Sequence, residues 1–322
     1  MKVLKATNEN IALAAGVIKK GGLVAFPTET VYGLGADGLD PITVAKIFEA
    51  KQRPSFNPLI LHIASCDKFH SICDINNGAV DKLIKKFWPG PLTLVLPKKN
   101  IVPDIVTAGH PTVAVRMPNH PVALELIKQS DRPIAAPSAN AFSQLSPTNA
   151  DHVVKQLNNK VDIILDGGSC TVGVESTILH VGEDSFNILR PGGLAIEEIE
   201  SVIGKVNIVT SSDESPLAPG QLKYHYAPRI ELKFFNEVNL SEYAGKKIGA
   251  LLFSGNKYNR KFTKEKILTP NGDLREAAAN LFSYLHELEN EDLDIILVDS
   301  IEETGLGKAI MDRLRKAANK FI

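Results

Sequence analysis

The sequence has few cysteines, and their arrangement excludes two classes of small protein. Three cysteines occur among 322 residues, Cys66, Cys73 and Cys170, and no pair has the C-x-x-C spacing. An odd and scattered set fits neither a disulfide framework nor a zinc site, and it is typical of a reducing compartment. We therefore expect a cytoplasmic protein whose cysteines are packing residues.

Long apolar runs are missing as well, and neither sign of charge predominates. No stretch approaches the ~20 apolar residues that span a bilayer, so we expect no membrane segment. The first residues contain no continuous apolar core, and we expect no signal peptide. The 36 Lys and Arg residues are balanced by 37 Asp and Glu residues. This balance disfavours a strongly basic nucleic-acid binder, because phosphate contacts need clustered positive charge.

The motifs of several large enzyme classes are absent too. The sequence contains no G-x-x-x-x-G-K-[ST], G-x-S-x-G or H-E-x-x-H pattern. Its eight histidines show no metal-ligand spacing, so we expect no protein-built metal site. Residues 33–38 match G-x-G-x-x-G, but no helix begins directly after them. We interpret these glycines as a tight loop rather than a dinucleotide site.

The pattern that is present alternates short β-branched runs with amphipathic stretches, which predicts an α/β fold with a mixed sheet. We expect strands at residues 23–26, 59–63, 92–96, 112–117, 134–136, 161–165, 177–181 and 187–189. We expect helices at residues 41–51, 79–87, 122–129, 151–157 and 196–203. The helix at 41–51 has a clear start, because Asp40 is a good N-cap and Pro41 suits the first helical turn.

A change of composition divides the chain. Residues 209–229 are rich in Ser, Pro and Gly, which is typical of a linker. We expect one domain at 1–208, the linker at 209–229, and a smaller α/β domain at 230–322. In the smaller domain we expect strands at 247–253 and 294–299 and helices at 274–289 and 306–320. The first of these helices has one apolar face, made of Leu274, Ala277, Ala278, Leu281, Leu285 and Leu288.

Two pairs of polar residues stand where ligands commonly bind. Lys51 and Arg53 lie two apart at a helix end, a pairing that suits a triphosphate or a carboxylate. The alternative is a basic last turn that complements the helix dipole. Ser138 and Asn140 follow the strand at 134–136, at a strand end where α/β sheets bind ligands. The alternative there is an ordinary turn.

Three further candidates are weaker when taken singly. The hydroxyl-rich segment 27–33 follows a strand and precedes the glycines, so it suits a small polar substrate, or it is turn chemistry alone. Arg190 ends a strand and could neutralise a phosphate or carboxylate, although such a residue is often a surface ion pair. His62 lies in an apolar strand, where a lone histidine is usually a core residue.

Taken in order, these segments resemble the threonylcarbamoyl-AMP synthase family, in its long two-domain form with a YrdC-like N-terminal domain. The matching N-terminal stretches are PTETVYGLG (27–35), KQRPSFNPL (51–59), FWPGPLTLVL (87–96), VAVRMPNH (113–120), APSAN (136–140), SPT (146–148), DGG (166–168), GVESTI (173–178) and LRPGG (189–193). The matching C-terminal stretches are APGQLKYHYAP (218–228) and ETGLGKAIMDRL (303–314). One departure follows Asn140, where the family usually has a small residue, Ser and Gly and this chain has Ala141-Phe142-Ser143.

The resemblance implies a fold and an activity. The fold would be a twisted mixed-sheet domain followed by a smaller Rossmann-like α/β domain. The activity would be that of a nucleotidyltransferase that combines L-threonine, bicarbonate and ATP into threonylcarbamoyl-AMP with release of pyrophosphate. Mg²⁺ would accompany ATP. The product would serve threonylcarbamoyladenosine modification of tRNA through a downstream tRNA-modifying enzyme, and we expect no stable direct tRNA binding.

The resemblance also implies roles for particular residues. The catalytic polar residues would be Lys51, Arg53, Ser138 and Asn140. The threonine contacts would be Thr30, His62, Arg116 and Ser176. The ATP contacts would be Arg53, Asn57, Thr112, Ser138, Ser146, Arg190, His225 and Tyr226. No covalent enzyme nucleophile is needed in such a reaction, so catalysis would consist of positioning and electrostatics.

Two other functions fit parts of the sequence. One is a non-catalytic RNA-binding module of the same fold, against which the equal numbers of acidic and basic residues in 1–210 weigh. The other is a related carbamoyl- or acyl-transferring enzyme with a different amino acceptor.

Overall fold

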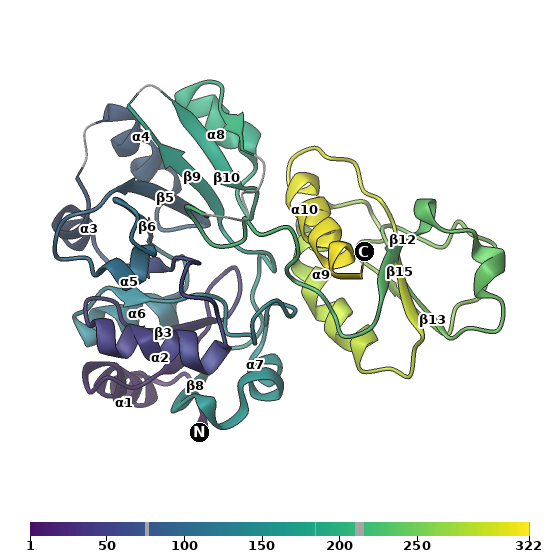
Figure 1. The fold of residues 1–322 in the computed structure, drawn as a ribbon, viewed down its shortest axis with the longest axis horizontal. Helices are drawn as coiled ribbons and strands as arrows, with labels where there is room; N and C mark the ends of the chain where they lie inside the picture. The colour runs from purple at the N-terminus through teal and green to yellow at the C-terminus, as the bar shows by residue number, and fades with distance from the viewer. Residues whose placement is uncertain (75–76, 184, 210–215, 322) are drawn as a thin grey trace.

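The computed structural model describes residues 1–74, 77–183, 185–209 and 216–321, and two α/β units make up the chain (Figure 1). The larger unit contains an 11-stranded mixed sheet, and the C-terminal unit contains a four-stranded sheet whose strands are all parallel. The predicted α/β class with a mixed sheet is confirmed. Residues 210–215, inside the expected linker, lie outside the described residues.

The strands of the larger sheet are hydrogen-bonded in an order far from their order in the chain. From edge to edge they are β1 (Lys2–Lys5), β8 (Ile163–Asp166), β2 (Val24–Phe26), β3 (Gly33–Asp37), β7 (Ile134–Ala135), β4 (Ile60–His62), β6 (Thr112–Arg116), β5 (Leu92–Pro97), β9 (Thr177–Val181), β10 (Phe186–Arg190) and β11 (Asn207–Ile208). The helices of this unit are α1 (Asn8–Lys19), α2 (Pro41–Lys51), α3 (Cys66–Ile72), α4 (Gly78–Phe87), α5 (Asp104–Thr107), α6 (Pro121–Ser130), α7 (Ala150–Leu157) and α8 (Ile196–Ile203).

Helix α2 shows how local sequence positions a functional segment. The Asp40 side chain accepts a hydrogen bond from the backbone N–H of Ile42, and Pro41 occupies the first turn, as expected. The helix ends at Lys51, and the next residue, Gln52, has a left-handed φ of 54° that turns the chain sharply. Lys51 therefore remains on the buried face of the helix, while Arg53 begins the loop that follows it.

The glycine-rich segment at 33–38 is not a tight loop, and that expectation is wrong. Gly33–Asp37 forms β3, a buried strand that pairs antiparallel with both β2 and β7. A Cβ on Gly35 would lie 2.7 Å from the Phe26 ring and from Ile134. The glycine is needed because neighbouring side chains pass directly over this strand, which the hydrophobic pattern does not reveal.

The C-terminal sheet has the strand order β12 (Leu232–Phe234), β15 (Ile295–Val298), β13 (Ile248–Leu252) and β14 (Lys264–Ile267). Helices α9 (Leu274–Glu289) and α10 (Gly307–Ala318) lie between this sheet and the larger unit (Figure 1). The predicted apolar face of α9 is buried except for Leu274, which is partly exposed. Among the described residues, no helix is long and apolar enough to cross a membrane.

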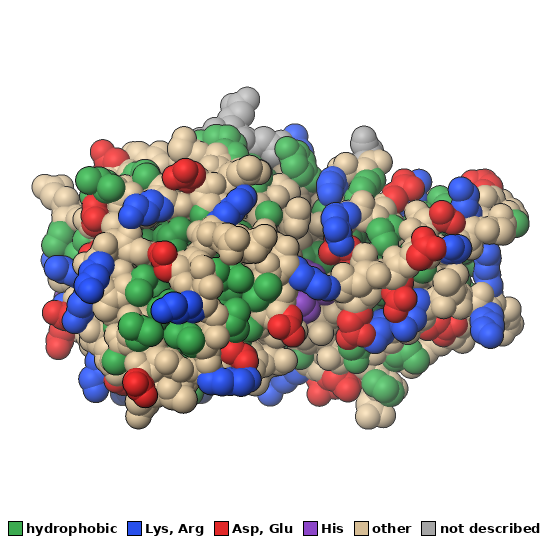
Figure 2. Space-filling model, turned by 90° about the horizontal axis from the view of Figure 1, so that it is seen from below, with side chains coloured by type: hydrophobic (Ala, Val, Ile, Leu, Met, Phe, Trp, Pro, Cys, Tyr) green, Lys and Arg blue, Asp and Glu red, His purple; other side chains and the backbone are tan. Residues whose placement is uncertain are grey.

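The two units share a continuous packed core. One cluster of buried side chains joins Val31, Leu145 and Val174 of the larger unit to the apolar faces of α9 and α10. At Gly173, where φ is 76°, a Cβ would lie 2.4 Å from the backbone of α9. On the face that Figure 2 shows, acidic and basic side chains are interspersed over both units.

A buried pair of histidines joins the two units and predicts sensitivity to acid. The rings of His152 in α7 and His286 in α9 are stacked, with centroids 3.8 Å apart. Burial and the His286 ring lower the pKa of His152 from 6.5 to about 3, and burial lowers the pKa of His286 to about 4. Below pH 6.5 the unfolded chain therefore binds protons that the folded chain does not, so stability falls with the pH.

Each of these histidines should contribute a slope of up to about 1.4 kcal/mol per pH unit between about pH 6.5 and pH 4. Urea unfolding across that range should show a shallower pH dependence in a His152→Asn, His286→Asn double variant. His70→Asn is the control, because this ring is exposed in the folded chain as in the unfolded one. An unchanged slope in the double variant would contradict the explanation.

Candidate active site

A cavity lies where several strands of the larger sheet end. His62 is the last residue of β4 and Arg116 the last of β6, and the two are register partners in parallel strands. Arg190 ends β10, and Ser176 directly precedes β9. The cavity comprises about 510 Å³ when the space at its open mouth is included.

Nine of the residues that the resemblance implies line this cavity. They are Thr30, Arg53, His62, Arg116, Ser138, Ser176, Arg190, His225 and Tyr226. The other five predicted residues, Lys51, Asn57, Thr112, Asn140 and Ser146, are not part of its lining. Segments separated by almost two hundred residues thus meet at one place, as the ordered motifs require.

Arg116 organises one side of the cavity. Its Nη1 donates a hydrogen bond to Thr30 Oγ1 at 2.9 Å, and its Nε donates to the Gly90 carbonyl at 3.2 Å. Its Nη2 forms an ion pair with Glu29 at 2.6 Å, deep in the protein. The Thr30 hydroxyl is also 2.9 Å from Thr28 Oγ1. This side therefore presents hydroxyl groups beside a guanidinium, a combination that suits a small hydroxylated carboxylate.

Arg190 organises the opposite side. Its Nη2 and Nε donate to the Ser176 carbonyl at 2.9 and 3.2 Å, and its Nη1 donates to the Pro219 carbonyl at 3.2 Å. Among the described residues, no carboxylate forms an ion pair with Arg190 or with Arg53. Both guanidinium groups are more than nine-tenths buried. Their positive charge is therefore offset by neutral carbonyls and hydroxyls, which leaves it available to an anion.

Lys51 and Asn57 act behind the cavity wall. The Lys51 ammonium donates to the carbonyls of Ser138, at 2.6 Å, and Asn140. The Ser138 hydroxyl donates in turn to Asn140 Oδ1 at 2.5 Å. Asn57 accepts hydrogen bonds from Arg53 through its side-chain oxygen at 2.6 Å and its carbonyl at 3.1 Å. Lys51 thus fixes the 138–140 loop, and Asn57 fixes the arginine.

Burial lowers the pKa of three basic side chains in and behind the cavity lining. Burial, with neighbouring Arg53, holds the pKa of Lys51 well below its usual range. Burial lowers the pKa of Arg53 to about 9, with a contribution from Arg190. Burial and Arg116 lower the pKa of His62 to about 3, so this imidazole is neutral. An anion bound here would relieve the cost of holding these cations away from water.

Seven buried side-chain atoms have no hydrogen-bond partner among the described residues, and four of them belong to residues that the resemblance implied as ligand contacts. These four are His62 Nδ1, Asn57 Nδ2, Thr112 Oγ1 and Arg116 Nη2, and the other three are Arg313 Nη2 and both carboxylate oxygens of Glu29. Buried polar groups are nearly always satisfied, so each such atom needs an explanation. Thr112 stands at the start of β6, away from the cavity lining. Of the atoms without a partner, His62 Nδ1 belongs to a residue of the lining, where a polar ligand in the cavity would satisfy it.

Glu175 also lines the cavity, although no role was predicted for it. Its carboxylate accepts hydrogen bonds from Ser146 Oγ and, at 2.7 Å, from Nε of Arg313 in α10. Burial alone would raise the pKa of this carboxyl, but Arg313 and Arg190 outweigh it and hold the pKa below its usual range. The signal was present in the GVESTI stretch, but its partner lies 138 residues away and could not be paired by spacing.

The linker closes one wall of the cavity through Pro219, Gly220, His225 and Tyr226. Burial, together with Arg53 and Lys51, holds the pKa of His225 well below its usual range. Residues 141–143, where the chain departs from the usual family sequence, pack against this linker. Ser143 adopts the left-handed φ of 65° that a glycine would favour. The Ser143 carbonyl then accepts a hydrogen bond from the backbone N–H of Ala227 at 3.0 Å.

Comparison with known proteins gives the chain its family. Residues 16–192 match the Sua5, YciO and YrdC family model, described as telomere recombination. Residues 194–319 match the model described as the threonylcarbamoyl-AMP synthase C-terminal domain. These two matches together cover both units of the fold.

Curated relatives match over nearly the whole chain. The threonylcarbamoyl-AMP synthase of Pyrococcus abyssi is 45% identical over 96% of this chain and 94% of the relative. That of Bacillus subtilis is 41% identical over 98% of this chain and 94% of the relative. A crystal structure of Pyrococcus abyssi Sua5 complexed with L-threonine has a TM-score of 0.92 and 43% identity, covering 99% of this chain and 98% of that one. These matches confirm the resemblance and the enzyme class: the chain belongs to the two-domain threonylcarbamoyl-AMP synthase family of nucleotidyltransferases.

Proposed function

We propose that this enzyme makes threonylcarbamoyl-AMP from L-threonine, bicarbonate and ATP and releases pyrophosphate. The observation that carries the proposal is the convergence of the implied threonine contacts and several implied ATP contacts on one cationic cavity. The relatives' names and the threonine complex of the Pyrococcus abyssi protein support it. An RNA-binding module without catalysis has no comparable support.

The side of the cavity around Arg116 suits threonine. The guanidinium would bind the carboxylate, and the Thr30 hydroxyl beside it would meet the polar groups of the amino acid. The Ser176 hydroxyl, 3.2 Å from Arg190 Nη2, would contact the amino acid from the other side. A neutral His62 can accept or donate a hydrogen bond without adding charge. A site that bonds the substrate hydroxyl rejects an analogue that lacks it more strongly than a methyl pocket does.

The side around Arg190 suits the nucleotide. Arg53 and Arg190 carry charges that no described carboxylate neutralises by an ion pair, so they can meet phosphate oxygens. Ser138 belongs to the same lining and would contact the phosphates. Mg²⁺ would arrive as part of MgATP, held mainly through phosphate oxygens, which is the usual mode for this ion. Among the described residues, no cluster of His, Cys, Asp or Glu could hold a metal ion.

The chemistry follows from this placement. The amino group of threonine and bicarbonate would first form a carbamate with loss of water. A carbamate oxygen would then attack the α-phosphorus of ATP, forming the new phosphorus–oxygen bond while the bond to the departing pyrophosphate breaks. Three anionic groups must lie close together for this step, and the buried cations would reduce their repulsion. The protein contributes no covalent nucleophile.

The further course of the product is part of the same proposal. A mixed anhydride of a carbamate and AMP is an activated carbonyl donor, so an acceptor must take up the threonylcarbamoyl group. We infer that a downstream tRNA-modifying enzyme transfers it to adenosine of tRNA, and that this chain acts in the cytoplasm. The 36 basic and 37 acidic residues of the chain, interspersed on the face that Figure 2 shows, are compatible with a protein that hands over a small molecule without binding tRNA stably.

The direct test measures pyrophosphate release by the purified full chain. We expect release only when ATP, bicarbonate and threonine are all present, with threonylcarbamoyl-AMP formed in equal amount. A panel of amino acids identifies the acceptor, and serine and valine should be poorer substrates than threonine. ATP turnover that ignores threonine would contradict the proposal.

Arg116→Lys should affect threonine more than ATP. The lysine retains the charge beside Glu29 but loses the planar fork that binds a carboxylate with two hydrogen bonds. We expect the KM for threonine to rise about 10- to 100-fold, with the KM for ATP within about twofold of the wild type. Arg132→Lys is the control, because Arg132 is exposed and away from the cavity. An equal rise in both KM values would refute a threonine-specific role.

Lys51→Met should lower both turnover and stability. It leaves the buried carbonyls of Ser138 and Asn140 without their charged donor, at a cost of about 1–3 kcal/mol for each group. Loss of the loop geometry should reduce kcat by about 10²–10³. Lys46→Met, on the exposed face of the same helix, should change neither quantity appreciably. Steady-state kinetics and thermal unfolding of both variants check this, and a fully active Lys51→Met enzyme would disprove the role.

A further inference from the structure

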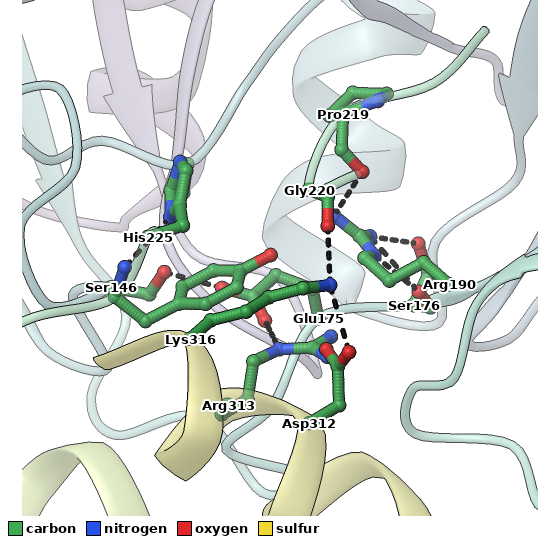
Figure 3. Close-up of polar contacts among 12 residues, drawn as sticks. Ser146, Glu175, Ser176, Arg190, Pro219, Gly220, His225, Asp312, Arg313 and Lys316 are labelled. Carbon is green, nitrogen blue, oxygen red and sulfur yellow. Dashed lines mark hydrogen bonds and ion pairs between the residues drawn. The ribbon is translucent and has the colours of Figure 1, made fainter. Parts of the chain in front are cut away.

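The buried side chain of Arg313 connects the C-terminal unit to the cavity. It projects from α10 and is 1% exposed, although a free arginine is rarely buried. Its Nε donates to Glu175 Oε2 at 2.7 Å, and its Nη1 donates to Asp312 at 2.5 Å. Figure 3 shows this arginine beneath the Glu175 carboxylate, on the side away from Arg190.

Glu175 is an acid in a cavity that must bind anions. It directly precedes Ser176, whose carbonyl accepts two hydrogen bonds from Arg190. The carboxylate and the Arg190 guanidinium are close enough for each to shift the pKa of the other. Without another partner, a buried carboxylate in this position would draw Arg190 into an ion pair. A guanidinium engaged in that way is no longer free to bind phosphate.

Arg313 also supports the linker wall of the cavity. Its guanidinium lies over the Tyr226 ring, 4.8 Å from the centroid. Three residues further along α10, Lys316 donates to the Gly220 carbonyl at 2.7 Å and forms an ion pair with Asp312 at 2.7 Å (Figure 3). One helix of the C-terminal unit thus holds both the acid of the cavity and the linker segment that packs against Arg190.

Gly220 makes this arrangement compact. Its φ is 86°, and a Cβ there would lie 2.5 Å from the Tyr226 hydroxyl and 2.7 Å from Arg190 Cδ. The linker backbone, the tyrosine and the arginine therefore pack without room for a further side chain. Any rotation of Arg190 toward Glu175 would have to occur within this packing.

We propose that Arg313 is a positioning residue for the nucleotide site: by holding Glu175 in an ion pair, it keeps Arg190 free for the phosphates of ATP. The inference rests on the proposed function, because it takes ATP as the anion. It gives the C-terminal unit a definite part in the reaction, performed without contact between Arg313 and the substrate.

Removing the Glu175 charge as well as the Arg313 charge distinguishes a positioning role for Arg313 from a purely structural one. In Arg313→Met the Glu175 carboxylate loses its partner and competes for Arg190, so the KM for ATP should rise at least about tenfold. The KM for threonine should stay within about twofold of the wild type. In the Arg313→Met, Glu175→Gln double variant no carboxylate competes, and the KM for ATP should return to within about threefold of the wild type. Arg315→Met, which removes an exposed arginine paired with Glu303, is the matched control.

The outcomes separate cleanly. An unchanged KM for ATP in Arg313→Met, or a double variant no better than the single one, overturns the inference. If Arg313→Met does not fold, the double variant still decides, because replacing both charges of a buried pair is better tolerated than removing one. A raised KM for ATP in a folded double variant then overturns it. The dissociation constant for ATP, measured by calorimetry, tests the same inference even if threonine-dependent pyrophosphate release fails and the proposed function with it.

Discussion

The burial of several cations around one cavity is the constraint on which the rest of this structure depends. Arg53, Arg116 and Arg190 line the cavity with little access to water, and Lys51 lies directly behind it. Removing such charges from water costs several kcal/mol for each ion before any partner is considered. Carbonyls at strand ends and two buried acids recover part of this cost. The remainder favours an anionic ligand, which connects the stability of the site to its chemistry.

The two buried acids, Glu29 and Glu175, stabilise the buried cations without neutralising Arg53 or Arg190 by an ion pair. Glu29 forms an ion pair with Nη2 of Arg116, while Nη1 and Nε of this arginine donate to Thr30 and to the Gly90 carbonyl. Glu175 is held by a residue of the C-terminal unit rather than by a cation of the cavity lining. Each acid therefore has a committed partner. Each unit has buried apolar clusters of its own, and a shared cluster and the Glu175–Arg313 ion pair join the two.

The sequence predicted the parts of the fold that local pattern controls. Helices α2, α8 and α9 have the expected bounds, because caps and apolar periodicity act within a few residues. Strand β3 was misinterpreted, since its glycines are required by side chains of neighbouring strands that pack directly against its backbone. Edge strands β1 and β11 were not predicted, because their residues are mostly exposed and show no apolar pattern. The ordered motifs indicated which residues converge, but the ion pair between Glu175 and Arg313 depends on tertiary packing alone.

The difference between local pattern and tertiary packing also explains why some predicted residues line the cavity and others lie behind it. Lys51 and Arg53 lie two apart, and a sequence argument treats them as a pair that faces one ligand. The left-handed turn at Gln52 separates them, so that one supports the loop at 138–140 and the other enters the lining. Spacing indicates which residues are near a site, and the backbone turn between them decides which of them reaches it. Such a turn costs about 1–3 kcal/mol at a residue other than glycine. In return, neighbouring cations serve different tasks: one fixes the geometry in which the other meets an anion.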